Sequence, residues 1–253
     1  MSSPKTFIVT GASRGIGLAT AKYLLAAPHS HNVVVLARSA EPLQQLKDQY
    51  PQQVAVLSGD LADLSLGQQA VDLALSSFGG LDGLVLNHGW LGQVAPIAEA
   101  DPAQWQQGFA VNFFSGVAFV KAALPTLRQS HGRIIFTSSA AGVKPIPAWG
   151  LYGASKAAMN HLARTLGEEE PAVTTVSIDP GLVDTEMQRE IREDLATAME
   201  SQLHSFFTSA HKAGGLSKPE QPGHVIAKLV VGAPKELSGR FIEWNDQVLR
   251  AFQ

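Results

Sequence analysis

Short apolar runs alternate with longer stretches of helical periodicity along almost the whole chain. The runs at residues 6–9, 33–36 and 54–57 are each followed by a helical stretch, and the pattern continues to a last run at 240–244. Within each run the apolar residues are largely consecutive, which is typical of strands covered on both faces of a parallel sheet. Right-handed crossovers connect such strands into a doubly wound fold. We therefore expect an α/β fold in one domain over residues 1–253, with a parallel sheet of about seven strands and helices on both faces.

The composition excludes several functional classes. Hydrophobic residues make up 45% of the 253 positions and charged residues 16%, which indicates a globular chain with a sizeable core. The formal net charge is -3 and there is no basic run, so we expect no nucleic-acid partner. The chain has no cysteine, which removes disulfides, thiolate metal ligands and cysteine nucleophiles, and we expect no metal.

Neither a secretion signal nor a membrane span is expected. The N-terminus leads almost directly into the first apolar run, which leaves no room for a signal peptide. The stretch at 109–125 is broken by Asn112, Ser115 and Lys121, so no uninterrupted apolar stretch approaches the ~20 residues of a membrane span. The expectation is a soluble, cytoplasmic protein without membrane contacts.

A glycine-rich turn follows the first strand. Gly11, Gly15 and Gly17 have the spacing Gly-x-x-x-Gly-x-Gly, between the strand and the next helix. Glycines at such a place allow a tight turn and let a pyrophosphate approach the N–H groups of a helix N-terminus. The turn therefore favours nucleotide binding, although an ordinary connection between a strand and a helix is the alternative.

Tyr152 and Lys156 are four residues apart at the expected start of a helix, so their side chains share one face. A free phenol has a pKa of about 10. A cation ~4 Å from its phenolate contributes ~4 kcal/mol at an effective dielectric constant of ~20. That is a shift of ~3 pK units, which would bring the pKa of the phenol close to neutral. Chance occurrence of Tyr-x-x-x-Lys on a helix surface is the alternative.

These motifs, with several positions between and after them, resemble the short-chain dehydrogenase/reductase family. Residues 10–17 resemble its cofactor loop and residues 152–156 its active-site motif. The resemblance covers nearly the whole chain, is nearest to a microbial branch close to sepiapterin reductase and benzil reductase, and implies a Rossmann-type oxidoreductase. The other matching positions occur in the family's order: Asp60-Leu61, Asn87-His88-Gly89, Asn112, Ser138-Ser139 and Pro180-Gly181-Leu182-Val183-Asp184-Thr185.

The resemblance assigns Ser139, Tyr152, Lys156 and Asn112 to catalysis. Tyr152 would protonate the developing alkoxide, and Lys156 would supply positive charge and hold the nicotinamide ribose. The family's spacing selects Ser139, rather than Ser138, as the hydrogen-bond donor to the substrate carbonyl. Asn112 would distort its helix and hold a water of the proton relay. The alternative for Asn112 is a buried asparagine that is hydrogen-bonded within the core.

The residue after the second strand selects the cofactor. An acidic residue about 20 positions past the glycine loop would bind the adenosine ribose of NAD, but Arg38 stands here and no carboxylate does. Arg38 and Arg14 offer donors to a 2′-phosphate, and each charged hydrogen bond contributes roughly 1.5–3 kcal/mol. We therefore expect NADP(H). A solvated charge at the strand end is the alternative for Arg38.

Further cofactor contacts follow from the resemblance. Asp60 would contact the adenine amino group, although an Asx turn is an alternative or additional role. Leu61 would pack on the adenine ring. Thr185 would bind the cofactor, or form a capping box with Gln188. The full predicted set is Gly11, Ser13, Arg14, Gly15, Ile16, Gly17, Arg38, Asp60, Leu61, Asn87, Gly89, Tyr152, Lys156, Pro180, Gly181, Val183 and Thr185.

An apolar, aromatic pocket is expected opposite a mobile lid over residues 184–215. It would contain no fixed basic cluster, which suits a neutral carbonyl compound. The branch that the chain resembles reduces vicinal diketones, so the favoured reaction takes an aromatic α-diketone to an α-hydroxy ketone. The alternatives are a 3-oxoacyl, sugar or pteridine ketoreductase and, from another class, a non-catalytic NADP-binding redox regulator. The predicted pocket residues are Trp90, Val143, Trp149, Leu182, Met187 and Phe206.

His88 departs from the family's usual Asn-Ala-Gly and is expected to be hydrogen-bonded into the structure rather than catalytic. The resemblance also implies self-association through the helices that contain Asn112 and Tyr152. We expect a homodimer, or a tetramer built on it, and a small-molecule carbonyl substrate.

Overall fold

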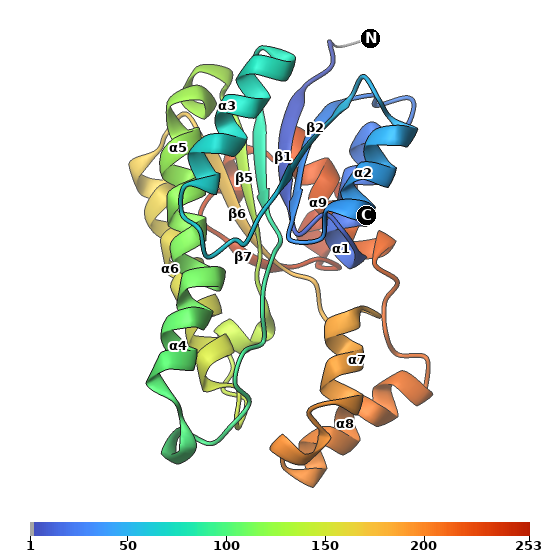
Figure 1. The fold of residues 1–253 in the computed structure, drawn as a ribbon, viewed down its shortest axis with the longest axis vertical. Helices are drawn as coiled ribbons and strands as arrows, with labels where there is room; N and C mark the ends of the chain where they lie inside the picture. Colours follow the sequence, from blue (N-terminus) through green and yellow to red (C-terminus); the bar gives the residue numbers. More distant parts are fainter. Residues whose placement is uncertain (1–2) are drawn as a thin grey trace.

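The computed structural model describes residues 3–253, and Figure 1 shows them as a sheet between two layers of helices. All seven strands lie in one parallel sheet with the order β3-β2-β1-β4-β5-β6-β7. The doubly wound parallel sheet expected from the apolar runs is confirmed. The strands are β1 (Thr6–Thr10), β2 (Asn32–Ala37), β3 (Val54–Ser58), β4 (Gly83–Leu86), β5 (Arg133–Thr137), β6 (Thr174–Asp179) and β7 (Phe241–Glu243).

Two hydrophobic clusters fill the space between the sheet and its two helical layers. Neighbouring residues of β1 point to opposite faces, so Phe7 and Val9 belong to one cluster and Ile8 to the other. Helices α1 (Gly15–Leu25), α2 (Ala40–Gln49) and α9 (Glu220–Gly232) cover the face of Phe7, whereas α3 (Leu66–Phe78), α5 (Ser115–Ser130) and α6 (Gly150–Glu169) cover the face of Ile8. Burial on both faces explains why the strand sequences are consecutively apolar.

One long helical stretch, Pro102–Ser130, has three parts. Helix α4 (Pro102–Phe109) continues through a π-helical turn (Ala110–Phe114) into α5. Its most apolar 18-residue window has a mean hydropathy of 1.4, so by length and composition it could cross a membrane, contrary to the expectation from the sequence. In this fold α5 packs against the sheet and α3 through Phe119, Val120, Ala123 and Leu127. Its apolar composition is therefore that of a helix that covers a sheet.

The carboxyl ends of the strands meet at one edge of the sheet. The strand order reverses between β1 and β4, which is the place where ligands bind in open α/β sheets. Helices α7 (Glu186–Glu193) and α8 (Ser201–Lys212) lie beyond this edge, across from α4 (Figure 1). The short 3-10 segments are Ile97–Glu99, Ala140–Gly142, Ala196–Ala198, Lys235–Leu237 and Gln247–Phe252.

Candidate active site

Tyr152, Lys156 and Ser139 come together at the carboxyl edge of the sheet. Helix α6 begins at Gly150, so Tyr152 and Lys156 lie in its first two turns, and both are buried. Ser139 follows β5, and its side chain lies close enough to Tyr152 to lower the pKa of that phenol. The neighbouring Ser138 instead donates to Asn160 Oδ1 at 2.7 Å. Ser139 therefore lies beside the tyrosine, whereas the Ser138 side chain is buried and hydrogen-bonded to α6.

The pKa of Tyr152 differs from the expectation that Lys156 brings it close to neutral. Burial of the phenol raises its pKa, the negative charge of Asp179 raises it further, and the neighbouring side chain of Ser139 lowers it. Lys156 Nζ donates to the carbonyl oxygen of Thr137 at 2.7 Å and lies 5.6 Å from the centroid of the Tyr152 ring. Burial lowers the pKa of Lys156 itself to about 8. Desolvation therefore outweighs the attraction of the ammonium, and the phenol is held protonated.

Asn112 lies in the π-helical turn between α4 and α5. Its Oδ1 accepts from the N–H of Trp90 at 2.8 Å, and its Nδ2 donates to the carbonyl of Trp90 at 2.8 Å and to Ser155 Oγ at 3.1 Å. The helix distortion implied by the resemblance is present. The amide is also bonded to protein groups, as the alternative of a satisfied buried asparagine requires.

His88 connects the end of β1 to the π-helical turn. Its Nδ1 lies 2.7 Å from Thr10 Oγ1, and its Nε2 lies 2.9 Å from the carbonyl oxygen of Val111 and 2.8 Å from Ser115 Oγ. Because a carbonyl can only accept, we assign the proton to Nε2. Burial, and then the charge of Lys156, lower the pKa of His88 to about 4. His88 is therefore a neutral structural link, as the sequence suggested.

The glycine-rich turn has the geometry of an anion-binding loop. Gly11 and Gly15 have φ values of 65° and 55°, and a Cβ on Gly17 would overlap the carbonyl oxygen of Gly11. Helix α1 begins at Gly15, and no side chain of the described residues caps its N–H groups. Asn87 supports the turn by donating to the carbonyls of Thr10 and Gly11 at 3.3 and 3.4 Å. These features fit a dinucleotide pyrophosphate.

A family model described as short chain dehydrogenase matches residues 5–196. The chain belongs to the short-chain dehydrogenase/reductase family. It is therefore an NAD(P)-dependent oxidoreductase with a small-molecule substrate.

Three similar proteins illustrate the relationship. Benzil reductase ((S)-benzoin forming) of Saccharomyces cerevisiae is 40% identical over 260 residues, which cover 98% of this chain and 99% of that protein. A short-chain dehydrogenase/reductase structure from the same yeast has a TM-score of 0.96 and 37% identity, and covers 98% of this chain and 99% of its own. A short-chain dehydrogenase of Shigella flexneri, complexed with NADP, has a TM-score of 0.79 and 25% identity, with 96% and 97% coverage.

The residues predicted to hold the adenosine follow β2 and β3. Arg38, after β2, is exposed, and so is Arg14 in the glycine-rich turn after β1. Asp60 Oδ1 accepts from the N–H of Ala62 at 3.0 Å, so the Asx turn is formed. Leu61, which is predicted to pack on the adenine ring, is 6% exposed and lies in a core cluster with Leu66.

The loop after β6 is the segment predicted to hold the nicotinamide. Gly181 has a φ of 67°, Val183 is buried, and Pro180 precedes them at the strand end. Thr185 begins α7 but makes no side-chain capping bond, and its hydroxyl donates to the carbonyl of Val183 at 3.3 Å. The capping box with Gln188 is therefore wrong. Thr185 lies against the glycine-rich turn, because a Cβ on Gly15 would come within 3.2 Å of its methyl group.

The remaining predicted cofactor positions surround the same edge. Ser13 and Ile16 lie in and just after the glycine-rich turn and are half-buried. Gly89 lies beside Lys156, because a Cβ there would be 3.5 Å from the Lys156 Nζ. Within residues 3–253 no group of three or more His, Cys, Asp or Glu side chains could hold a metal ion.

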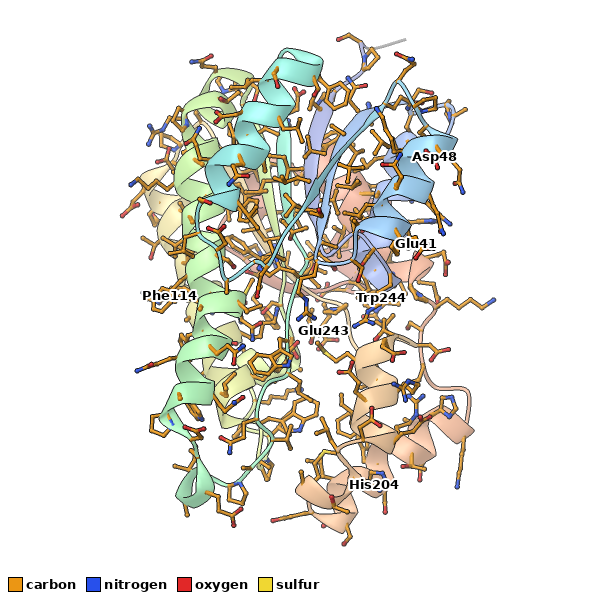
Figure 2. The ribbon with its side chains drawn as sticks, viewed as in Figure 1. Glu41, Asp48, Phe114, His204, Glu243 and Trp244 are labelled. Carbon is orange, nitrogen blue, oxygen red and sulfur yellow. The ribbon has the colours of Figure 1, made fainter. Side chains whose placement is uncertain are left out.

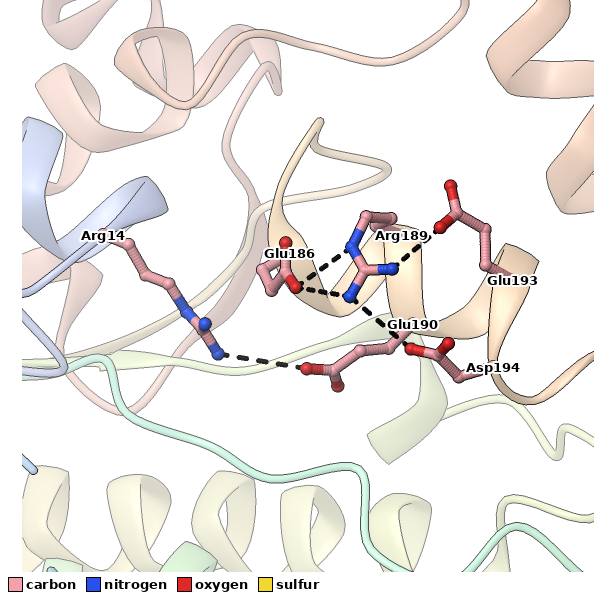
Figure 3. Close-up of polar contacts among 6 residues, drawn as sticks. All are labelled: Arg14, Glu186, Arg189, Glu190, Glu193 and Asp194. Carbon is pink, nitrogen blue, oxygen red and sulfur yellow. Dashed lines mark hydrogen bonds and ion pairs between the residues drawn. The ribbon is translucent and has the colours of Figure 1, made fainter. Parts of the chain in front are cut away.

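An ionic cluster on α7 faces the glycine-rich turn, as Figure 3 shows. Arg14 Nη2 lies 3.9 Å from Glu190 Oε1. Arg189 is paired with Glu186 at 2.6 Å and with Glu193 at 2.7 Å, and lies 3.5 Å from Asp194. The sequence analysis did not identify this contact between α7 and the loop, since spacing along the chain says nothing about which helix lies opposite Arg14.

An apolar cluster surrounds Tyr152. Trp149 stacks on Phe207 of α8 with ring centroids 5.4 Å apart and planes inclined by 3°, and it lies perpendicular to Tyr152 with centroids 6.0 Å apart. The predicted Leu182 and Met187 pack against this cluster. The other buried members are Leu91, Val94, Ala141, Ile191 and Met199.

Three predicted pocket residues are not among the buried members of this cluster. Phe206 is 55% exposed and outside the cluster, because its neighbour Phe207 faces inward. The sequence analysis did not name Phe207, and its helical spacing to Leu203, four residues earlier, was the signal that could have placed it in this cluster. Val143 is exposed and lines, with Trp149 and Lys144, a cavity of about 280 Å³ beside the cluster. Trp90 is half-buried, and its backbone binds Asn112.

Proposed function

We propose that this protein is an NADPH-dependent carbonyl reductase that acts on neutral, aromatic ketones and reduces a benzil-type α-diketone to an α-hydroxy ketone. The observation that carries the proposal is the buried group of Ser139, Tyr152 and Lys156 beside an aromatic cluster. A bound NADPH supplies the hydride. The chain's own residues bind the ketone, orient it and provide the proton.

Each catalytic side chain has a defined task. Ser139 donates a hydrogen bond to the carbonyl oxygen and polarises it. Tyr152, held protonated by burial, transfers its hydroxyl proton to the same oxygen as negative charge develops there. Lys156 stabilises the resulting phenolate. Asn112 holds the backbone of Trp90 against the π-helical turn through two hydrogen bonds.

The preference for NADPH is supported by charge. Arg14 and Arg38 lie at the adenosine side, where NAD-dependent relatives need an acidic residue for the ribose. Both guanidinium groups are exposed and can donate to a 2′-phosphate. The similar Shigella flexneri structure is complexed with NADP, which supports the same choice.

Two observations support an aromatic diketone. The walls beside Tyr152 are Trp149, Phe207 and aliphatic side chains, which suit flat, uncharged groups. The indole N–H of Trp149 is buried and has no hydrogen-bond partner among the described residues. Since a buried unsatisfied donor costs ~1–3 kcal/mol, a second substrate oxygen that accepts from it would gain affinity. The similarity to a benzil reductase agrees with this substrate class.

The test is a substrate panel with purified protein and NADPH. Benzil, an acetoacetyl thioester, a keto sugar and an oxidised pteridine are offered in turn, and NADPH oxidation is followed. We expect the highest kcat/KM for benzil. Tyr152→Phe should bind NADPH almost normally and lose at least ~100-fold in turnover, the lower range for general acid catalysis. NADPH binding without reduction of any of these compounds would favour the non-catalytic redox regulator.

We also propose a homodimer in the cytoplasm. The outer side of the α4–α5 stretch exposes apolar side chains, among them Phe114 at 49% and Val117 at 38% exposure. Figure 2 shows Phe114 pointing away from the sheet. Phe109, Phe113 and Phe114 contact one another and extend this face. An apolar face of this kind is suited to a second copy of the chain.

A further inference from the structure

His88 is a buried imidazole that the mechanism above does not use. It lies two residues after β4 and is 7% exposed. Its Nδ1 lies 2.7 Å from Thr10 Oγ1, and its Nε2 lies 2.9 Å from the carbonyl oxygen of Val111. A neutral imidazole has one donor and one acceptor, so both ring nitrogens are used, each with a partner on a segment distant in the sequence.

The Val111 carbonyl lies where the hydrogen-bond pattern of the helix shifts. In an α-helix it would accept from the N–H of Ser115, four residues later. In the π-helical turn that N–H donates to the carbonyl of Ala110 instead. Two side-chain donors approach the Val111 carbonyl, namely His88 Nε2 and the Ser115 hydroxyl at 2.6 Å. The ring of His88 therefore supplies a donor to the carbonyl that the π-helical turn deprives of its α-helical partner.

The residue after Val111 is Asn112, which belongs to the proposed catalytic group. Its amide binds the N–H and the carbonyl of Trp90, each at 2.8 Å. Gly89 lies between His88 and Trp90, and a Cβ on it would be 3.5 Å from Lys156 Nζ and 3.9 Å from Asn112 Oδ1. This segment of three residues is thus bonded to the π-helical turn at both ends, and its middle residue packs against Lys156.

The other side of the ring is anchored to the sheet. Thr10 ends β1, and its hydroxyl accepts from the backbone N–H of Asn87 at 3.0 Å. Because the Nε2 proton is assigned to the bond with Val111, Nδ1 is the acceptor and the Thr10 hydroxyl donates to it. The bonds form a chain from the ends of two neighbouring strands, through the ring, to the π-helical turn. An alanine in place of His88 could form neither side-chain bond.

We propose that His88 is a positioning residue, whose ring fixes the π-helical turn to the end of β1 and so holds Asn112 beside Lys156 in the arrangement that proton delivery requires. The inference rests on the proposed function for its reaction, but it names a residue that does not touch the ketone or the hydride donor. Misplacement by ~1 Å of groups that must meet in a reaction can lower the rate by up to ~10²-fold.

The test compares two substitutions of His88. The amide of His88→Gln can donate to the Val111 carbonyl from near the place of Nε2, whereas His88→Phe keeps a buried ring and forms no hydrogen bond. We expect His88→Gln to keep kcat for benzil within about threefold, and His88→Phe to lose about tenfold or more. The dissociation constant for NADPH should change less than about threefold in both, because Asn87 and not the ring supports the glycine-rich turn.

A second buried histidine provides the matched control. His31 is 6% exposed and precedes β2 at the opposite edge of the sheet, where its Nδ1 accepts from the N–H of Lys5 at 3.2 Å. His31→Phe removes a buried histidine bond far from the site. It should lower the midpoint of urea unfolding and leave kcat unchanged, which separates positioning from a general loss of stability.

A double variant tests whether His88 acts through Asn112. If it does, adding His88→Phe to Asn112→Ala should lower kcat by less than about threefold beyond the effect of Asn112→Ala alone. A residue that only stabilises the fold would reduce kcat by the same factor in either background.

The N–H of Trp90 supplies a readout that needs no turnover, because it donates to Asn112 Oδ1. Its exchange with deuterium, followed by nuclear magnetic resonance, should be faster in His88→Phe and unchanged in His88→Gln. If His88→Phe does not fold by circular dichroism, His88→Asn takes its place, since its shorter amide does not reach Val111.

Four results would overturn the inference. They are an unchanged kcat in His88→Phe, equal losses in His88→Gln and His88→Phe, an undiminished loss in the Asn112→Ala background, and unchanged exchange at Trp90 in His88→Phe. Failure of the unmodified protein to reduce any ketone would instead reject the proposed function. The exchange at Trp90 would still decide whether His88 holds the π-helical turn in place.

Discussion

Tyr152 shows how two opposing electrostatic effects compete at a single residue. The spacing to Lys156 predicts attraction between phenolate and ammonium, and helix α6 does place both side chains in its first turns. Burial acts on the same phenol with the opposite sign and prevails, helped by Asp179. A protonated tyrosine is the form that reduction needs, so the proton donor is ready before the ketone arrives.

Trp149 offers a prediction at the same scale. Trp149→Phe keeps an aromatic ring against Phe207 but removes the unpartnered N–H. Because that donor is proposed to bind the second oxygen of a diketone, kcat/KM for benzil should fall about tenfold, the effect of one hydrogen bond, while a monoketone of the same size should be reduced as before. Steady-state kinetics with both ketones measures this. Trp105→Phe, outside the cluster, is the control, and equal losses for both ketones would show a packing role instead.

At the scale of elements, helix α7, in the segment predicted to be a lid, contacts the glycine-rich turn through the pair of Arg14 and Glu190. Helix α7 carries acidic residues toward Arg14, and its own Arg189 is paired with neighbours on the same helix. The Arg14–Glu190 pair is exposed and contributes little to stability. It does, however, place a carboxylate beside a guanidinium group that is proposed to bind a phosphate.

Two substitutions test the charges at this place. Glu190→Gln should tighten NADPH binding about two- to threefold at low salt, since it removes competition for Arg14, and the gain should vanish at high salt. Arg38→Asp should lower the ratio of NADPH to NADH activity at least about tenfold, through loss of donors and repulsion of the 2′-phosphate. Initial rates with each cofactor measure both effects. An unchanged ratio in Arg38→Asp would contradict the choice of NADPH.

At the scale of the whole molecule, both faces of the sheet are covered, and the outer side of the α4–α5 stretch exposes the apolar side chains of Phe114 and Val117. The apolar residues of that stretch therefore lie on two different sides of the helix. Phe119 and its neighbours cover the sheet, while Phe114 and Val117 face outward. The proposed homodimer would bury the second set.

The dimer is tested by Phe114→Glu, which puts a charge on that face. Light scattering after size exclusion should show a dimer for the unmodified protein and a monomer for the variant, because an unpaired buried charge destabilises an interface by several kcal/mol. Leu64→Glu, at another residue with 49% exposure, is the control and should leave the dimer intact. A monomer for the unmodified protein would contradict the proposal.

Acid should destabilise the whole fold through His88. The pKa of His88 is lowered from 6.5 to about 4, so the folded protein binds this proton less readily than the unfolded chain. The associated stability is fully present above pH 6.5 and is lost as pH falls from 6.5 towards 4, by about 3 kcal/mol in total. Urea unfolding at pH 7 and at pH 4.5 measures the loss, which should be smaller in His88→Asn. An equal loss in that variant would assign the acid sensitivity to other groups.

Much of the fold and part of the site could be predicted because they depend on local pattern. Consecutive apolar residues require burial on both sides, and this gave the parallel sheet and its layers. The glycine spacing and the i, i+4 relation of Tyr152 and Lys156 are also local, and they pointed to the family that the comparison with known proteins shows. One alternative from the sequence, the capping box of Thr185 with Gln188, is wrong. Leu61 lies in the core and Phe206 is exposed, and their roles at the site stay predictions.

The order of apolar and polar residues along this chain was enough to determine a doubly wound sheet, a nucleotide loop at its carboxyl edge and the helix face that carries the tyrosine and lysine, because each follows from periods of a few residues. Only the tertiary structure decided how strongly burial acts on Tyr152 and which side chain stacks on Trp149. Those properties depend on the distance between segments far apart in the sequence and on the water that packing removes from between them, and no local period contains that information.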